Sequence, residues 1–238
     1  VNADAVTTGG SLTINNTAEK TEATYDVYRI LDLKYDAANS SYAYTINDAW
    51  ANFFAQEDVA ELITTQTNQD GITYVTGISD AKTLSELAFA YAKDEKNGIS
   101  PLATETIPAK GSKTLTGLNL GYYLVGSSLG ALVNLNTTAL NVTVNEKNAE
   151  PDVKKEVVED TTSVGQDIHY TITVTVQKGA ENYVAKDTLS AGLTFNNDAV
   201  VYVGTSIVDA KNYEVKACAA NESCSFKVSF NNDYVSTL

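Results

Sequence analysis

The sequence predicts a mainly β chain that folds as two consecutive β-sandwiches, the first with a helical insertion. Three observations lead to this prediction. Short segments rich in β-branched and aromatic residues alternate between apolar and polar side chains, as strands with one buried face do. Turn-forming segments separate them at the spacing typical of sandwiches. At 238 residues, the chain is also long enough for two domains with a core each.

The first domain is expected over residues 1–148. Its strand segments alternate in hydrophobicity and are residues 11–17, 23–33, 42–48, 113–128 and 139–147. Because the region between the third and fourth segments loses this alternation and shows helical spacing instead, we expect the helical insertion there.

The insertion is expected to contain three helical segments. Residues 47–56 and 58–66 carry helix-start residues and helical spacing. Plain core packing against the sheet is the simplest account of the aromatic residues in the first of them, which are Trp50, Phe53 and Phe54. Residues 80–94 form the best predicted helix of the chain, with an apolar stripe made by Leu84, Leu87, Ala88 and Tyr91.

The second domain, expected over residues 149–238, is nearly all β. Residues 167–177 alternate without a break, which places on one face Ile168, Tyr170, Ile172, Val174 and Val176. His169 lies on the opposite, polar face, so we expect no catalytic or ligand role for it. Further strands are expected within 181–195, 198–204, 212–218 and 224–230. The chain stops soon afterwards, so this sandwich is expected to be incomplete at its C-terminus.

Composition excludes several classes of function. Sixteen basic and thirty acidic residues give a net charge of -14, which makes nucleic acid and anionic membranes poor partners. No phosphate-binding loop or dinucleotide fingerprint is present, and a single histidine argues against histidine-rich metal sites and most acid-base chemistry. No apolar run reaches the roughly 18 residues needed to span a bilayer. We therefore expect no cofactor and no metal.

Cys218 and Cys224 are the only cysteines. Their separation suits a disulfide that closes a short hairpin loop, a bond that contributes roughly 2 to 3 kcal/mol on the chain-entropy model. Two free thiols are the alternative. A structural zinc normally needs four ligands, and no histidine lies near this pair. A disulfide would indicate an exported protein.

Two lysines stand in unusual settings. Lys147 follows an alternating strand and precedes Pro151, so it should project from a strand end into solvent. Lys155 shares a face with Val153 and Val157, where desolvation favours the neutral, nucleophilic amine. A strand shifted by a bulge, or a lysine stem that reaches past its apolar neighbours to water, would explain Lys155 equally well.

Asp187 is the carboxyl group that could act with Lys155. If it shares a face with Tyr183, Ala185 and Leu189, it points toward the core, and burial favours its protonated form. A neutral acid beside a neutral amine can support amide formation: the amine attacks an asparagine side-chain carbonyl, the acid shuttles protons, and ammonia leaves. The alternative is that Asp187 caps the turn that follows it.

The order of these segments resembles a known family. The run from Pro151 through Val157, with 163–176 and 186–195 after it, resembles the isopeptide-forming domain of sortase-assembled pilus shaft subunits of Gram-positive bacteria. The segments SLTINNT, TYDVYRILD, YAYTINDAWANFF and GLNLGYYLV are similar to the N-terminal domain of the same pilins. The resemblance covers almost the whole chain, and it implies tandem immunoglobulin-like sandwiches of the Cna B type.

The resemblance also implies roles for three residues. In these pilins the sortase-acceptor lysine usually lies in Tyr-Pro-Lys-Asn; here Lys147 and Asn148 match, whereas Asn145 and Glu146 replace the tyrosine and proline. Lys154 is the fallback acceptor.

In the second domain, Lys155 matches the lysine that forms the internal isopeptide bond, and Asp187 matches its catalytic acid. The partner asparagine of the family lies on the closing strand, which we expect beyond the end of this chain, so Asn231 and Asn232 are not assigned that role. With no C-terminal sorting signal, no signal peptide and no initial methionine, the sequence is expected to be an excised piece of a longer chain.

The function implied by the resemblance is structural. A sortase would join the C-terminal threonine of one subunit to Lys147 of the next, giving a covalent pilus anchored to the cell wall, outside the cell. The implied partners are copies of the same pilin, the pilin-specific sortase, minor and tip pilins, and a host surface ligand. No enzymatic activity is expected beyond the autocatalytic isopeptide reaction.

Two further questions stay open at this stage. The chain could instead be a surface adhesin or minor pilin that binds host matrix or glycans, with residues 42–54 and the loop 74–80 as the places to look. The first domain could also carry a cross-link of its own through Lys34 or Lys82, but the sequence offers neither lysine a convincing acid partner.

Overall fold

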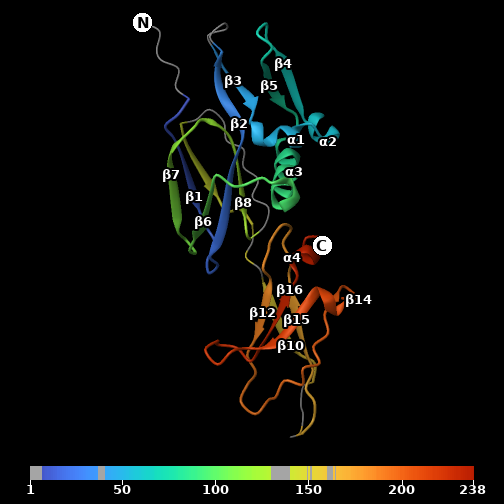
Figure 1. Ribbon diagram of the computed structural model, residues 1–238. Helices are drawn as coiled ribbons and strands as arrows, with labels where there is room; N and C mark the ends of the chain where they lie inside the picture. Colours follow the sequence, from blue (N-terminus) through green and yellow to red (C-terminus); the bar gives the residue numbers. More distant parts are fainter. Residues whose placement is uncertain are drawn as a thin grey trace. The chain divides into compact units, whose positions relative to one another are not determined.

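The computed structural model describes residues 7–36, 41–129, 140–148, 150, 152–159, 163 and 165–238. Most of its regular structure is β-strand, distributed over several sheets, which confirms the mainly β fold class (Figure 1). The chain divides into two compact units, residues 1–150 and 151–238, and each is described by itself.

The first unit contains a six-stranded sheet and a three-stranded sheet. The larger sheet has the order β4 (Ile63–Thr67), β5 (Thr73–Ile78), β3 (Ser41–Ile46), β2 (Ala23–Asp36) and β6 (Ala103–Ile107), with β8 (Gly121–Ser127) also paired with β2. The smaller sheet has the order β7 (Ser112–Leu118), β1 (Gly10–Asn15) and β9 (Asn141–Asn145). In it β9 runs parallel to β1, so the end of β9 lies beside the end of β1.

Two apolar clusters hold this unit together, and the long strand β2 contributes to both. Tyr25 and Val27 belong to the cluster that joins the two sheets, together with Leu12, Ile14, Ile107, Tyr123, Val125 and Val144. Tyr28 and Ile30 belong to the cluster under the helical insertion. A register shift between Arg29 and Leu31 interrupts the pairing of β2 with β8. The first unit is therefore a sandwich with a second, helix-covered core.

The helical insertion packs as predicted at its aromatic residues, but it is shorter than predicted. A 3-10 turn (Asp48–Trp50) leads into α1 (Ala51–Phe54), and Trp50, Phe53 and Phe54 are all buried. The prediction that residues 58–66 are helical is wrong beyond α2 (Glu57–Ala60). Residues 63–67 form β4 instead, because their threonines and isoleucine suit a strand and β5 is available to pair with them.

Helix α3 (Ala81–Lys93) is the helix predicted at residues 80–94. The Asp80 side chain caps it by accepting a hydrogen bond from the Thr83 backbone N–H at 3.0 Å. Leu84 and Ala88 of the predicted stripe are buried, whereas Leu87 and Tyr91 are partly buried against the same cluster. Phe89 and Ala92 extend the buried face beyond the prediction. A 3-10 turn (Glu95–Asn97) follows the helix.

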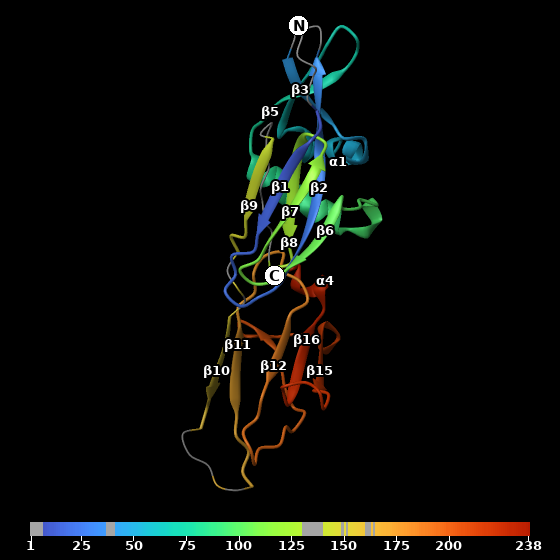
Figure 2. The ribbon, with the colours of Figure 1, turned by 90° about the vertical axis from the view of Figure 1, so that its left-hand side faces the viewer.

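The second unit consists of short antiparallel pairings around a small core. β10 (Val153–Val157) pairs with β11 (Tyr170–Val174), and a separate sheet has the order β12 (Val184–Asp187), β16 (Phe226–Phe230) and β15 (Tyr213–Ala217) (Figure 2). The remaining elements are a hairpin of β13 (Tyr202–Val203) and β14 (Ser206–Ile207), a 3-10 turn (Ala210–Asn212) and α4 (Asn232–Val235). The buried cluster is made of Ala180, Tyr183 and Val235, with Val174 and Phe230 packed against it.

The alternation predicted for residues 167–177 is confirmed over residues 171–174 of β11, where Ile172 and Val174 are partly buried and Thr171 and Thr173 are exposed, whereas Tyr170 of the predicted inward face is exposed as well. The face of β10 is less buried than predicted. Val153 and Val157, which flank Lys155, are 51% and 52% exposed. Lys155 is turned toward Asp187 on the other sheet, as an inward-facing residue would be, but its surroundings are not the apolar core that we expected, because the described residues leave much of the apolar face of β10 open to solvent.

Candidate functional site

Lys147 lies just after β9, at the point where the strand leaves the sandwich. Val142 and Val144 face inward along this strand, and Glu146 continues the inward series as a buried residue with 6% exposure. Lys147, one position further, is exposed. The structure thus places the predicted acceptor lysine at a strand end facing solvent, immediately beside a buried carboxyl group.

The Glu146 carboxylate is the acceptor of four hydrogen bonds. Its Oε1 accepts from the backbone N–H of Lys147 at 3.2 Å and from Asn148 twice, from the backbone N–H at 3.0 Å and from Nδ2 at 2.9 Å. Its Oε2 accepts from the Ser127 hydroxyl. Because each contact supplies a donor, the carboxylate is satisfied although it is buried.

The main chain of Glu146 is also held on both sides. Its N–H donates to the Asn15 carbonyl at 3.0 Å, and its own carbonyl accepts from the Thr17 hydroxyl at 2.9 Å. Tyr25 lies close to the carboxylate in the sandwich core. Burial first, and the charge of Glu146 second, raise the pKa of the Tyr25 hydroxyl. The loop of Lys147 is therefore tied to β1 and β8.

Sequence reasoning missed Glu146, which was noted only as a departure from the proline of the family motif. A signal was available, because Val142, Val144 and Glu146 form one series of period two. An acid in such a series means either that the inward face has been assigned one residue out of register or that the acid is buried with hydrogen-bond partners.

Lys155 and Asp187 meet in the second unit. The Lys155 Nζ lies 2.8 Å from Asp187 Oδ2, although the two residues are 32 positions apart and belong to different sheets. The same nitrogen lies 4.3 Å from the centroid of the Tyr170 ring, on the strand paired with β10. The Lys155 side chain is 30% exposed and that of Asp187 is 12% exposed, so the contact between them is partly shielded from water.

The other lysines singled out in the sequence occupy ordinary surface positions. Lys154 is 66% exposed and lies 2.8 Å from Glu156 Oε1. Lys34 and Lys82 are exposed as well. Neither Lys34 nor Lys82 is shielded from water as Lys155 is, so neither has the setting expected of a lysine in an internal cross-link.

The two cysteines form a disulfide, with a Cα–Cα distance of 5.7 Å. It joins the segment after β15 to the segment before β16, and Glu222 lies between the two. Glu222 accepts hydrogen bonds from Lys227 Nζ and from the Ala219 backbone N–H, and these hold its pKa at about 2. Disulfide sulfurs carry no thiolate charge, so the two cysteines close a loop and do not act with Glu222 as metal ligands.

Most of the large aromatic residues in the places considered for an adhesive face are internal. Trp50, Phe53 and Phe54 of residues 42–54 are buried, and residues 73–78 form strand β5 rather than a loop, with Tyr74 and Val75 buried. The expectation of a binding loop at 74–80 is therefore wrong for most of its length, because the alternating Thr, Tyr and Val residues pair with β4.

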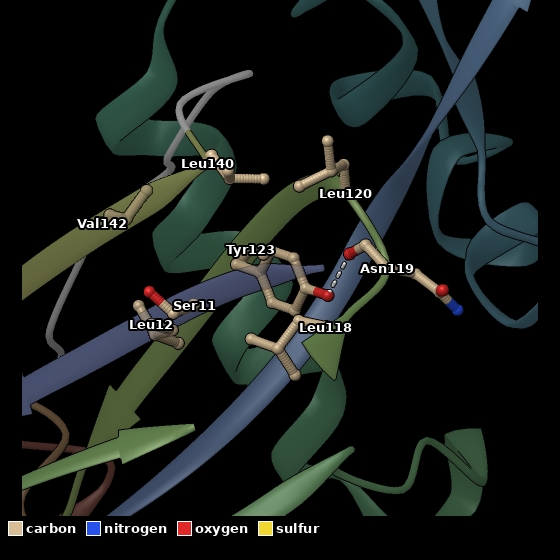
Figure 3. A pocket seen from close by; sticks show the side chains of 10 residues that line it. Ser11, Leu12, Leu118, Asn119, Leu120, Tyr123, Leu140 and Val142 are labelled. Atoms are coloured by element: carbon tan, nitrogen blue, oxygen red, sulfur yellow. Dashed lines mark hydrogen bonds between the residues drawn. The ribbon is translucent and has the colours of Figure 1, made fainter. Parts of the chain in front are cut away.

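A small pocket opens at one end of the first unit, between β1, β8 and β9 (Figure 3). Its lining is mostly apolar, including Leu12, Leu118, Leu140 and Val142, and the Tyr123 hydroxyl donates to the Asn119 carbonyl beside it. Its volume of about 20 Å³ holds little more than one water molecule. Ligand sites for small molecules are at least an order of magnitude larger, so this pocket is no substrate site.

His169 lies on the polar face, as predicted, and its ring Nδ1 contacts Glu159. The hydrogen bond and the charge of Glu159 raise the pKa of His169. This pairing therefore contributes stability that is fully present below the pKa of the unfolded histidine and is lost as pH rises through the folded pKa. Because His169 is the only histidine, its imidazole signal in a proton NMR titration reports this pKa directly.

We expect Glu159→Gln to shift that titration down toward the ordinary value of about 6.5. The variant removes the charge while keeping a side chain of the same size. Identical titrations in the two proteins would contradict the contact.

No helix in the described part of the chain is both long and apolar enough to cross a membrane. No family model matches the sequence, and no curated protein matches it.

Two solved structures similar to this chain are pilins. The T6 backbone pilin of serotype M6 Streptococcus pyogenes is 15% identical, with a TM-score of 0.42, and the match covers 98% of this chain and 52% of the pilin. The major pilin SpaD of Corynebacterium diphtheriae is 17% identical, with a TM-score of 0.38, and the match covers 97% of this chain and 53% of SpaD. This chain thus spans about half the length of either protein.

Proposed function

We propose that this chain is a structural subunit of a covalently polymerised surface pilus. In this proposal a sortase joins each subunit to the next through Lys147, and an internal isopeptide bond at Lys155 stabilises the second unit. Its partners are neighbouring copies of the same chain, the sortase, and minor pilins, on the surface of a Gram-positive cell wall. The only chemistry of its own is the intramolecular amide bond.

The observation that carries this proposal is the contact between Lys155 and Asp187. The Lys155 amine and the Asp187 carboxyl group lie 2.8 Å apart, partly shielded and beside an aromatic ring, and they are the nucleophile and the proton-transfer group that a reaction with an asparagine side chain needs. The Lys155 amine would attack the side-chain carbonyl carbon of an asparagine, an amide bond would form, and ammonia would leave. Asp187 would take a proton from the amine and return one to the departing nitrogen.

The setting of Lys147 supports the second part of the proposal, the linkage between subunits. An acceptor amine must reach a carbonyl carbon held in another protein, so it has to be exposed and its main chain has to be fixed. Lys147 is exposed, and the residue before it is bound to two other strands by backbone and side-chain contacts. Amide formation at its Nζ would release one amine proton and the leaving group of the acyl donor.

The proposal is tested by mapping the acceptor. The full chain is incubated with the pilin-polymerising sortase of its source organism and a labelled peptide that carries the sorting signal. We expect one label per chain, on Lys147, located by tandem mass spectrometry. Lys154, which is 66% exposed, is the internal comparison, since exposure alone would favour it. A label on Lys154, or one spread over surface lysines, would contradict the assignment.

A further inference from the structure

The buried carboxyl group of Glu146 has a setting that core packing alone does not require. Residues on the inward face of β9 are apolar up to Val144, and a valine or leucine at position 146 would continue that face. The chain instead carries an acid with 6% exposure, whose Oε1 is turned back onto the two residues that follow it.

We propose that Glu146 is a positioning residue for the acceptor lysine. Its carboxylate holds the main chain of Lys147 and Asn148 in one turn, so that the Lys147 side chain is presented to the sortase in a single orientation. This inference rests on the proposed role of Lys147 as the acceptor. The new element is the Glu146 carboxylate, which orders the main chain of Lys147 before the sortase binds.

The geometry of the turn supports this inference. One carboxylate oxygen accepts the consecutive backbone N–H groups of Lys147 and Asn148, and Asn148 adds its side-chain amide to the same oxygen. Successive N–H groups that converge on one anion form a concave arrangement of the backbone. The φ and ψ angles of both residues are restricted in this way, and less freedom remains to be lost when the lysine docks.

The other carboxylate oxygen connects the turn to rigid elements. Oε2 accepts from Ser127 at the end of β8, and the same hydroxyl accepts from the Leu129 backbone N–H at 3.1 Å. The main chain of Glu146 is bound at the same time to Asn15 and Thr17. A site held by strands is positioned more accurately than one held by a loop alone.

Glu146 differs from the proline of the family motif in keeping a backbone N–H at position 146. Proline restricts its own φ but has no N–H, so it could not donate to the Asn15 carbonyl. Glu146 keeps that donor, and its bond to Asn15 completes the last pair of the β1–β9 ladder, Asn15 with Asn145. We infer that the Glu146 side chain restrains the two residues that follow it, whereas the ring of a proline would restrain only position 146.

The experiment compares three variants of the full chain with the parent protein. Glu146→Ala removes the acceptor, whereas Glu146→Gln keeps an oxygen for the two backbone donors and presents an NH₂ group to Ser127. The matched control is Glu150→Ala, because Glu150 Oε1 also accepts two consecutive backbone N–H groups, those of Lys20 and Thr21 at 2.7 Å each. The control removes the same type of contact from a different loop of the same unit.

Two quantities are measured. The first is hydrogen exchange of the Lys147 and Asn148 amides by NMR, which needs no sortase. We expect exchange to accelerate at least tenfold in Glu146→Ala, to stay near the parent rate in Glu146→Gln, and to change only at residues 20 and 21 in Glu150→Ala. The second is transfer of the labelled sorting peptide to Lys147. We expect kcat/KM to fall about tenfold in Glu146→Ala, mainly through a higher KM for the chain, and to be restored in Glu146→Gln.

The outcomes separate the two proposals. Unchanged exchange in Glu146→Ala, or faster exchange with unchanged transfer, would overturn the positioning role and leave Lys147 as the acceptor. Transfer that misses Lys147 in the parent protein would overturn the proposed function, and the positioning role with it. If Glu146→Ala does not fold, Glu146→Asp is measured in the same two assays, because it keeps the charge but withdraws the oxygens by one methylene.

Discussion

Replacing Lys147 by arginine is expected to abolish the ladder of covalent polymers on the cell surface. Arginine keeps the positive charge at the end of β9, but its guanidinium group is no nucleophile at neutral pH. Because Lys147 is exposed, the melting temperature should change little. The measurement is an immunoblot of cell-wall extracts, boiled in detergent so that only covalent polymers survive.

The control for this experiment is Lys154→Arg, made in the same chain seven residues away in sequence. It removes the fallback acceptor, which is more than half exposed and paired with Glu156. Its ladder should match that of the parent protein. Polymers that persist in Lys147→Arg but disappear in Lys154→Arg would transfer the acceptor role to Lys154.

The second large effect is a loss of mass. Formation of the amide at Lys155 releases one ammonia, so the intact mass under denaturing, reducing conditions should lie about 17 Da below the value calculated from the sequence. The deficit should appear in any chain that contains the partner asparagine, so both residues 1–238 and a longer chain are measured. A deficit within residues 1–238 would place the asparagine among them.

Two variants locate the groups responsible. Lys155→Ala removes the amine, and Asp187→Ala removes the acid that lies 2.8 Å from it, so each should restore the full calculated mass. Lys154→Ala, one residue away on the opposite side of β10, should retain the deficit. The cross-linked chain should also unfold at a higher temperature than either variant, since the bond restricts the unfolded state, an effect of roughly 2 to 5 kcal/mol for comparable disulfide ties. A deficit that survives in Lys155→Ala would refute this assignment.

Local patterns in the sequence predicted much of the site. The alternation through Val142 and Val144 predicted that Lys147 would leave the strand on the solvent side, and the structure places it there. Helix α3 was predicted from its apolar stripe. Both depend on neighbours within a few positions, where a period of two or of 3.6 residues determines which side chains share a face.

Where the predictions failed, residues distant in sequence made the difference. Residues 63–67 have helical spacing, yet they form β4 because β5 offers a pairing edge. Val153 and Val157 have the pattern of a buried face, yet they are half exposed because, among the described residues, β10 pairs only with β11. In each case the local pattern fits more than one structure, and only the available partner selects between them.

The mainly β fold, helix α3 and the exposure of Lys147 followed from local patterns of residues, because each depends on the periodicity of neighbouring side chains. The structure adds that Lys155 lies against Asp187, a pair that the resemblance implied, and that Glu146 lies against Ser127, which nothing in the sequence indicated. Those contacts join different strands across 32 and 19 positions. Their formation depends on the paths of the intervening loops and on the pairing of whole strands, which no local pattern of residues encodes.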